Sequence, residues 1–118
     1  MKQSLQQDDR LLRRAFFKDP SYVREDMTVT SFAFKLRKKK ETGLSVDIER
    51  LTTYKKSIQD TKRFRLFALT VIKVNELGLN TVYCPIENNP AHAEIRGNLS
   101  NSICSQLAKA AVYVPYPY

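Results

Sequence analysis

The chain has 118 residues, of which 42% are hydrophobic and 27% are charged. This composition excludes a disordered chain and fits one domain with its own core, and no apolar run approaches the roughly 20 residues of a membrane-spanning helix. The formal net charge is +8, and residues 35–65 alone carry eleven basic and four acidic side chains. Such a concentration of positive charge favours a polyanionic partner.

The N-terminal residues 1–7 are polar and are expected to be flexible, so the predicted domain covers residues 8–118. This start lacks the apolar segment of a secretory signal, which predicts a cytoplasmic protein. Asp8 and Asp9 can cap a short helix over residues 10–17. An extended segment is the competing interpretation of this short run.

The next segment, residues 28–36, is rich in β-branched and aromatic residues. Large apolar side chains recur at every second position from Phe32 to Leu36, which predicts a strand. The basic residues 37–43 then predict a hairpin-like loop, and the clean alternation over residues 44–48 predicts the partner strand.

The middle of the chain predicts a helix followed by the main strand of the sheet. Apolar residues at helical spacing predict a helix over residues 49–61. A run of apolar β-formers over residues 65–74 predicts a long, buried strand in the centre of the sheet. A turn and a strand over residues 81–86 follow, with Pro85 favouring an edge or an end.

The last predicted elements are a short strand over residues 91–96 and a helix that Asn98 or Ser100 caps. Residues 112–114 are expected to lie extended against the domain. This order predicts a single α+β domain with a mainly antiparallel sheet of about five strands and two to three helices.

Cys84 and Cys104 lie in segments that read as a strand and a helix, and we expect free thiols in a reducing compartment. One histidine and two separated cysteines do not make a zinc-binding set, so no metal is predicted. The sequence also contains no phosphate-binding loop or dinucleotide fingerprint, and no cofactor is predicted.

The only histidine lies in the predicted strand that follows Pro90. The period of two places His92, Glu94 and Arg96 on one face of that strand. A proton-transfer group, a carboxylate and a guanidinium together are the equipment of a metal-independent ribonuclease. A surface ion pair between Glu94 and one of the two bases is the simpler interpretation.

Three segments together carry a resemblance to known proteins. They are residues 30–34 (Thr-Ser-Phe-Ala-Phe), residues 43–47 (Gly-Leu-Ser-Val-Asp), and residues 89–95 (Asn-Pro-Ala-His-Ala-Glu-Ile) with Gly97. This pattern resembles a group of small bacterial proteins without an assigned activity. The resemblance covers residues 28–110, implies a bacterial or phage origin, and assigns no catalytic residue.

The basic residues predict the binding surface. The candidate residues are Lys35, Arg37, Lys38, Lys39, Lys40, Lys62, Arg63 and Arg65. Loop cations of this kind contact phosphates without reading sequence, and Tyr22, Tyr54 or Tyr83 can supply rings for base stacking or else pack in the core.

The sequence favours a binding protein over an enzyme. The leading hypothesis is a small basic subunit that engages nucleic acid or an acidic protein through the Lys/Arg-rich loop, away from any membrane. The first alternative is a ribonuclease-like toxin or defence effector that uses His92, Glu94 and Arg96. The second alternative is a structural or regulatory subunit of a bacterial or phage complex.

Overall fold

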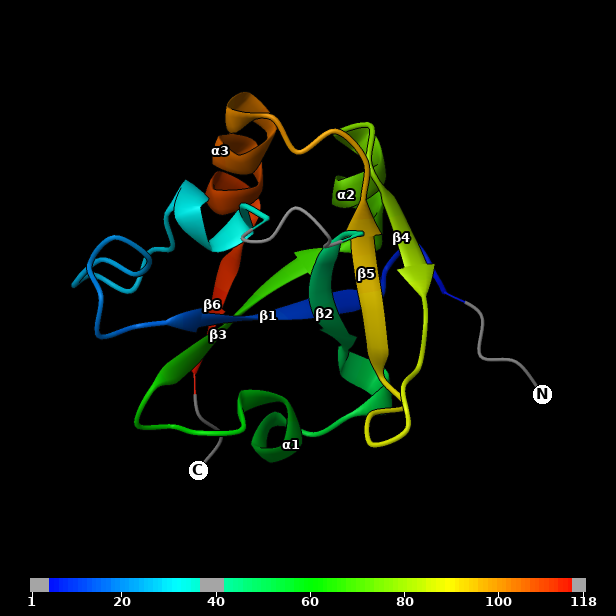
Figure 1. Ribbon diagram of the computed structural model, residues 1–118, viewed down its shortest axis with the longest axis horizontal. Helices are drawn as coiled ribbons and strands as arrows, with labels where there is room; N and C mark the ends of the chain where they lie inside the picture. Colours follow the sequence, from blue (N-terminus) through cyan, green and yellow to red (C-terminus); the bar gives the residue numbers. More distant parts are fainter. Residues whose placement is uncertain (1–4, 37–41, 116–118) are drawn as a thin grey trace.

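All strands lie in one antiparallel sheet with the order β4-β5-β2-β1-β3-β6, in a computed structural model that describes residues 5–36 and 42–115 (Figure 1). The strands are β1 (Arg10–Phe16), β2 (Leu44–Ile48), β3 (Phe64–Thr70), β4 (Asn80–Tyr83), β5 (His92–Arg96) and β6 (Val112–Val114). The helices are α1 (Tyr54–Ile58), α2 (Val71–Glu76) and α3 (Asn101–Ala110), with 3₁₀ turns η1 (Ser31–Phe34) and η2 (Glu49–Leu51). The predicted single α+β domain with an antiparallel sheet is confirmed, with six strands rather than about five.

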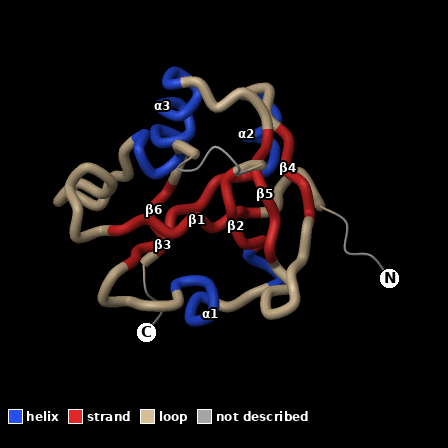
Figure 2. Tube along the Cα trace, viewed as in Figure 1, coloured by secondary structure: helices blue, strands red, loops and turns tan. Residues whose placement is uncertain are grey.

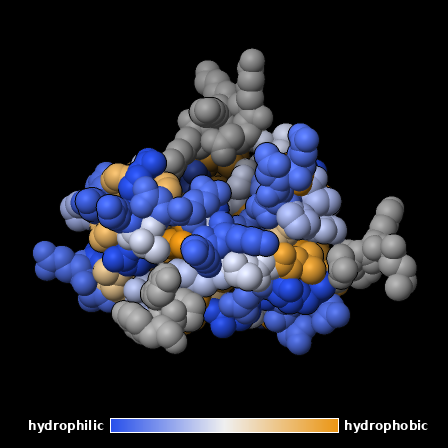
Figure 3. All heavy atoms as spheres, turned by 90° about the horizontal axis from the view of Figure 1, so that it is seen from below, coloured by the Kyte–Doolittle hydropathy of each residue, from blue (hydrophilic) through white to orange (hydrophobic). Residues whose placement is uncertain are grey.

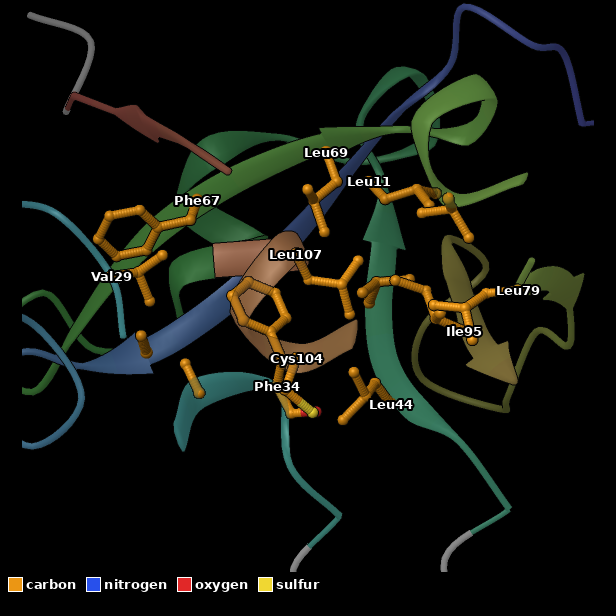
Figure 4. Close-up of a cluster of buried hydrophobic side chains, with 14 of the residues drawn as sticks. Leu11, Val29, Phe34, Leu44, Phe67, Leu69, Leu79, Ile95, Cys104 and Leu107 are labelled. Atoms are coloured by element: carbon orange, nitrogen blue, oxygen red, sulfur yellow. The ribbon is translucent and has the colours of Figure 1, made fainter. Parts of the chain in front are cut away.

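Two apolar clusters hold the sheet between its helices (Figures 1 and 2). The larger cluster packs one face of the sheet against α3, α2 and η1, and Figure 4 shows Phe34, Cys104 and Leu107 meeting the side chains of the strands. The smaller cluster joins Leu12 and Leu66 on the other face to Ile58 of α1. The larger cluster therefore carries most of the burial, and α1 covers only part of the second face.

The predicted helix over residues 10–17 is wrong, and the competing extended interpretation is correct. The segment forms β1, which pairs with β3 over seven residue pairs from Arg10 to Phe16. As an interior strand, β1 buries side chains on both faces, so Leu11 and Leu12 are both buried. Burial on both sides removes the alternation that would have distinguished a strand from a helix in the sequence.

The predicted strand over residues 28–36 is also wrong, because the segment forms the 3₁₀ turn η1. Ala33 and Phe34 are neighbours in sequence and both are buried, whereas Phe32 is 52% exposed. The turn packs against α3, where the Cys104 thiol contacts the Phe34 carbonyl oxygen at 3.1 Å. A strand would place adjacent side chains on opposite faces and could not bury both Ala33 and Phe34 in this cluster.

An arginine side chain connects β1 and β2 where the two strands separate. Their paired residues are Leu11 with Ile48 and Leu12 with Asp47, while the other edge of β2 pairs with β5 from Leu44 to Asp47. Beyond that point the Arg13 guanidinium donates to the Ser45 carbonyl oxygen at 2.9 Å and to the Ala33 carbonyl oxygen at 2.9 Å. These bonds satisfy backbone acceptors that the strand ladder leaves open.

The predicted helix over residues 49–61 is divided in two. Thr52 and Thr53 are extended and separate η2 from α1, and the Thr53 hydroxyl accepts the Lys56 backbone N–H at 3.2 Å. Hydroxyl capping of this kind favours the start of a new helix over the continuation of an old one.

The apolar run over residues 65–74 forms a strand only as far as Thr70. The Thr70 hydroxyl caps α2 by accepting the Lys73 backbone N–H at 3.2 Å. β3 has a neighbouring strand on each side, as an interior strand must, although β2 and β1 occupy the middle of the sheet.

The elements after α2 follow the sequence closely. β4 is an edge strand that ends before Pro85, Ser100 caps α3, and residues 112–114 form β6 on the opposite edge. Cys84 and Cys104 are free thiols. No helix in the described ranges is long and apolar enough to cross a membrane.

A buried carboxylate fastens the segment before β1 to η2. Asp9 is 5% exposed and accepts Arg50 Nε at 2.7 Å, Arg50 Nη2 at 3.1 Å and the Gln6 backbone N–H at 2.8 Å. Burial alone would raise the pKa of Asp9, but the Arg50 and Gln6 hydrogen bonds and the Arg50 charge outweigh it and lower the pKa below its ordinary value of 3.8.

We therefore expect Asp9→Asn to lower the free energy of unfolding at neutral pH by about 1.5–3 kcal/mol, the usual range for hydrogen bonds to a charged group. Because the folded-state pKa lies below the unfolded value, the contribution is present above pH 3.8 and is lost as the pH falls through the folded-state pKa. Urea denaturation over a pH series measures this. The exposed neighbour supplies the control Asp8→Asn, and a wild-type advantage that does not shrink in acid would contradict the prediction.

Candidate functional site

The strand β5 alternates as its sequence predicts. Ala91, Ala93 and Ile95 are all 0% exposed. His92 and Arg96 point away from that core and are partly exposed. The histidine therefore lies on the second face of the sheet, beside the area that α1 covers.

Two members of the predicted trio pair with each other. Arg96 Nε donates to Glu94 Oε1 at 2.9 Å, and the Thr42 hydroxyl donates to the same oxygen at 2.6 Å. The Thr42 bond, and then the Arg96 bond and the charges of Arg96 and His92, lower the pKa of Glu94 despite its partial burial. Glu94 and Arg96 thus form the surface ion pair that was the simpler interpretation of this motif.

Close backbone packing fixes the start of β2 beside that ion pair. A Cβ atom on Gly43 would lie 2.7 Å from the Ile95 carbonyl oxygen and 2.8 Å from Arg96 Cγ. Only glycine fits at this distance, so Gly43 allows the two strands to approach.

His92 makes different contacts, and they define its tautomer. Its Nδ1 lies 2.9 Å from the Cys84 carbonyl oxygen. Because a carbonyl oxygen can only accept, Nδ1 carries the proton and Nε2 of the neutral ring is an acceptor. Nε2 lies 3.4 Å from the Ser45 hydroxyl oxygen.

A cleft of about 670 Å³ opens in front of this histidine, and we name it the His92 cleft. Strand residues, the end of α1 and the β4–β5 turn line it: Leu12, Arg13, Arg14, Phe16, Ser45, Val46, Asp47, Gln59, Phe64, Ile86, Asn88, Asn89 and His92. The lining combines the apolar rings of Phe16 and Phe64 with amide, hydroxyl and imidazole groups, a combination typical of a small-molecule site.

Asp47 lies buried in the wall of the His92 cleft and is fully engaged. Its carboxylate accepts the Ser57 hydroxyl at 2.7 Å and the Asn89 side-chain amide at 2.7 Å, and Arg14 Nη1 lies 3.6 Å away. These contacts tie β2 to α1, β1 and the β4–β5 turn. Asp47 is therefore a structural carboxylate, and nothing in the local sequence pattern distinguishes it from an exposed strand residue.

The predicted basic residues fall on different sides of the sheet. Lys35 follows η1 on the α3 side and lies over the Phe32 ring, 4.5 Å from its centroid. Lys62 and Arg63 lie in the turn between α1 and β3, and Arg65 is the second residue of β3. The remaining candidates, Arg37, Lys38, Lys39 and Lys40, are outside the described residues.

The cations near β3 stack on aromatic rings. The Arg65 guanidinium lies 3.8 Å from the Phe17 centroid and donates to the carbonyl oxygens of Thr61 at 2.6 Å and Phe64 at 2.9 Å. Arg63 lies 5.1 Å from the Phe64 centroid. Rings and carbonyl oxygens hold these guanidinium groups in place without neutralising their charge.

A second cleft, of about 840 Å³, runs between α1, the turn before β3 and the end of β6, and we name it the basic groove. Its lining is Tyr54, Lys55, Ile58, Gln59, Asp60, Thr61, Lys62, Arg65, Tyr113 and Pro115. Within the described part of the chain, no carboxylate lies within ion-pairing distance of Lys55, Lys62 or Arg65. The side of the molecule that carries α1 is predominantly hydrophilic (Figure 3).

The contacts of Asp47 predict a large effect of its removal. We expect Asp47→Ala to lower the free energy of unfolding by about 3 kcal/mol, because Arg14 and two polar side chains lose a buried charged partner. The control is Glu49→Ala, which removes an exposed ion pair with Arg10 and should cost less than about 1 kcal/mol. Chemical denaturation of both variants measures the difference, and equal losses would refute the structural role of Asp47.

Comparison of the chain with protein-family models, with curated proteins and with solved structures yields no match.

Proposed function

We propose that the protein binds single-stranded nucleic acid in the basic groove. The observation that carries this proposal is the convergence of Lys55, Lys62 and Arg65, without carboxylate partners, on a groove that also contains two tyrosines. Phosphates are the ligands that such cations favour, and they supply affinity without reading sequence.

The tyrosines favour nucleic acid over an acidic protein. Tyr54 and Tyr113 come from α1 and β6 and line the groove together. The Tyr113 ring packs against Phe67 of the larger cluster, with 5.8 Å between the centroids, so the ring that lies on the α1 side of the sheet is that of Tyr54. Bases stack on rings of this kind regardless of sequence, whereas an acidic peptide gains little from them.

The proposal retains part of the binding surface expected from the sequence. Lys62 and Arg65 belong to the groove, and Arg63 stacks beside it. Lys35 lies on the α3 side of the sheet and does not contribute to the groove. The run from Arg37 to Lys40 stays a predicted contact.

Fluorescence anisotropy with labelled single-stranded RNA and DNA over a salt series tests the proposal. We expect the affinity of the wild type to fall as the salt concentration rises. The double variant Lys55→Ala/Lys62→Ala should bind more weakly. It should also reduce the magnitude of the slope of log affinity against log salt by about 1.4, which is about 0.7 per lost phosphate contact. The control Lys73→Ala/Lys109→Ala removes the same charge from α2 and α3 and should bind like the wild type. Equal binding by the two double variants would refute the basic groove.

A ring variant separates stacking from charge. Tyr54→Leu keeps an apolar side chain against Ile58 and removes the ring, so we expect about a tenfold loss for single strands, within the usual range for one stacked base. Binding to duplexes should not change. Binding of acidic peptides in preference to both nucleic acids would favour the protein-partner hypothesis instead.

The same samples test the ribonuclease hypothesis. RNA incubated with the protein in chelator should remain intact, because Glu94 and Arg96 are engaged with each other. Cleavage that His92→Ala abolishes would instead support the nuclease.

A further inference from the structure

The His92 cleft holds a serine and a histidine whose side chains lie within hydrogen-bonding distance of each other. Ser45 Oγ lies 3.4 Å from His92 Nε2, and the opposite ring nitrogen donates to the Cys84 carbonyl oxygen at 2.9 Å. A nucleophile, a base within hydrogen-bonding reach and a third group that orients the base are the elements of an activated hydroxyl. In the absence of substrate, the distance between a nucleophile and its base is often longer than in the substrate complex.

The backbone presents the Ser45 hydroxyl to the cleft. Leu44 and Val46 are buried on the other face of β2, so the alternation of the strand turns the Ser45 side chain outward, where it is exposed. The Arg13 guanidinium donates to the Ser45 carbonyl oxygen at 2.9 Å, which fixes this part of the backbone. The hydroxyl is therefore accessible and its position is constrained.

Ser45 is a better candidate for the nucleophile than the other polar groups near His92. Asp47, across from His92 in the strand pairing, is committed to Ser57 and Asn89. The Cys84 thiol lies 3.5 Å from Nδ1, but burial, and then the charge of Glu94, raises its pKa, so it stays protonated at neutral pH. Among the described residues, the Ser45 hydroxyl is thus the hydrogen-bonding partner of Nε2.

We propose that Ser45 and His92 form a nucleophile–base pair that hydrolyses carboxylic esters in the His92 cleft. Phe16, Phe64 and Ile86 line the cleft with apolar surface and fit an uncharged acyl or alcohol group. Arg14 and Asn88 line the same cleft; Arg14 Nη1 donates to the Ser57 carbonyl oxygen at 2.8 Å, which leaves the other guanidinium N–H groups and the Asn88 amide as donors for the negative charge on the carbonyl oxygen.

The reaction balances with water as the only co-reactant. Ser45 Oγ forms a bond to the ester carbonyl carbon and its proton passes to His92 Nε2. The bond from that carbon to the alcohol oxygen breaks, and the leaving alcohol takes the proton from Nε2. Water then attacks the acyl group and gives its proton to Nε2, the bond to Ser45 breaks, and Oγ recovers the proton as the carboxylic acid leaves.

An alkyl fluorophosphonate tests the pair directly, because it marks serines that a base activates. Attack by Oγ forms a bond to phosphorus and expels fluoride, which leaves a stable adduct that mass spectrometry of the full chain and its peptides locates. We expect one adduct, on Ser45, and none in Ser45→Ala. His92→Asn keeps an N–H donor near the Nδ1 position but has no base, so labelling should slow about 100-fold or more.

Two controls keep the result decisive. Ser105→Ala removes an exposed serine on α3 and should label at the wild-type rate. Circular dichroism shows whether each variant is folded, and p-nitrophenyl butyrate should give a burst of nitrophenol that only Ser45→Ala and His92→Asn lose. Adducts spread over several serines, equal labelling of His92→Asn, or no adduct and no burst would overturn the proposal. Because the basic groove is a separate cleft, its failure to bind nucleic acid would leave this test unaffected.

Discussion

The separation of β1 from β2 is the constraint on which the rest of the fold depends. Once the two strands part, backbone carbonyl groups on β2 and η1 need donors that the ladder no longer supplies. Arg13 supplies them by donating to Ala33 and Ser45. Along this stretch β1 stays paired with β3 and β2 stays paired with β5, each through its other edge.

Local pattern predicted the elements whose surroundings are simple. β5 buries one face and leaves the other partly exposed, and β2 places Leu44, Val46 and Ile48 on its core face with the polar Ser45 and Asp47 on the other, so both strands alternate in sequence. Ser100 is a typical N-cap residue, and its hydroxyl accepts the Ile103 backbone N–H at the start of α3. In these places propensity, periodicity and tertiary contacts agree, so the sequence alone was sufficient.

The two wrong predictions share a physical cause. β1 lies between two strands, and burial of both Leu11 and Leu12 hides its alternation. In η1 the core accepts Ala33 and Phe34 together, because α3 and the Arg13 bond hold the turn, although β-propensity favours a strand. Both outcomes depend on partners more than ten residues away, which no local window contains.

The candidate site was predictable only in part for a related reason. The period of two correctly placed His92, Glu94 and Arg96 on one face, but the choice of partners depends on strand register. Ser45 meets the imidazole because β2 pairs with β5. The sequence instead predicted that residues 44–48 pair with a strand over residues 28–36, and that pairing does not bring Ser45 and His92 together. Likewise, Lys62 joins Lys55 across a turn, whereas Lys35 faces the opposite side of the sheet.

Both clefts depend on the position of α1. A helix of five residues is too short to be stable alone, so contacts with the sheet must hold it. Ser57 binds the Asp47 carboxylate and Ile58 packs against Leu12, while Tyr54 and Lys55 line the basic groove. Gln59, at the end of the helix, lines both clefts. We therefore expect a change that loosens the Asp47–Ser57 bond to alter the shape of both clefts.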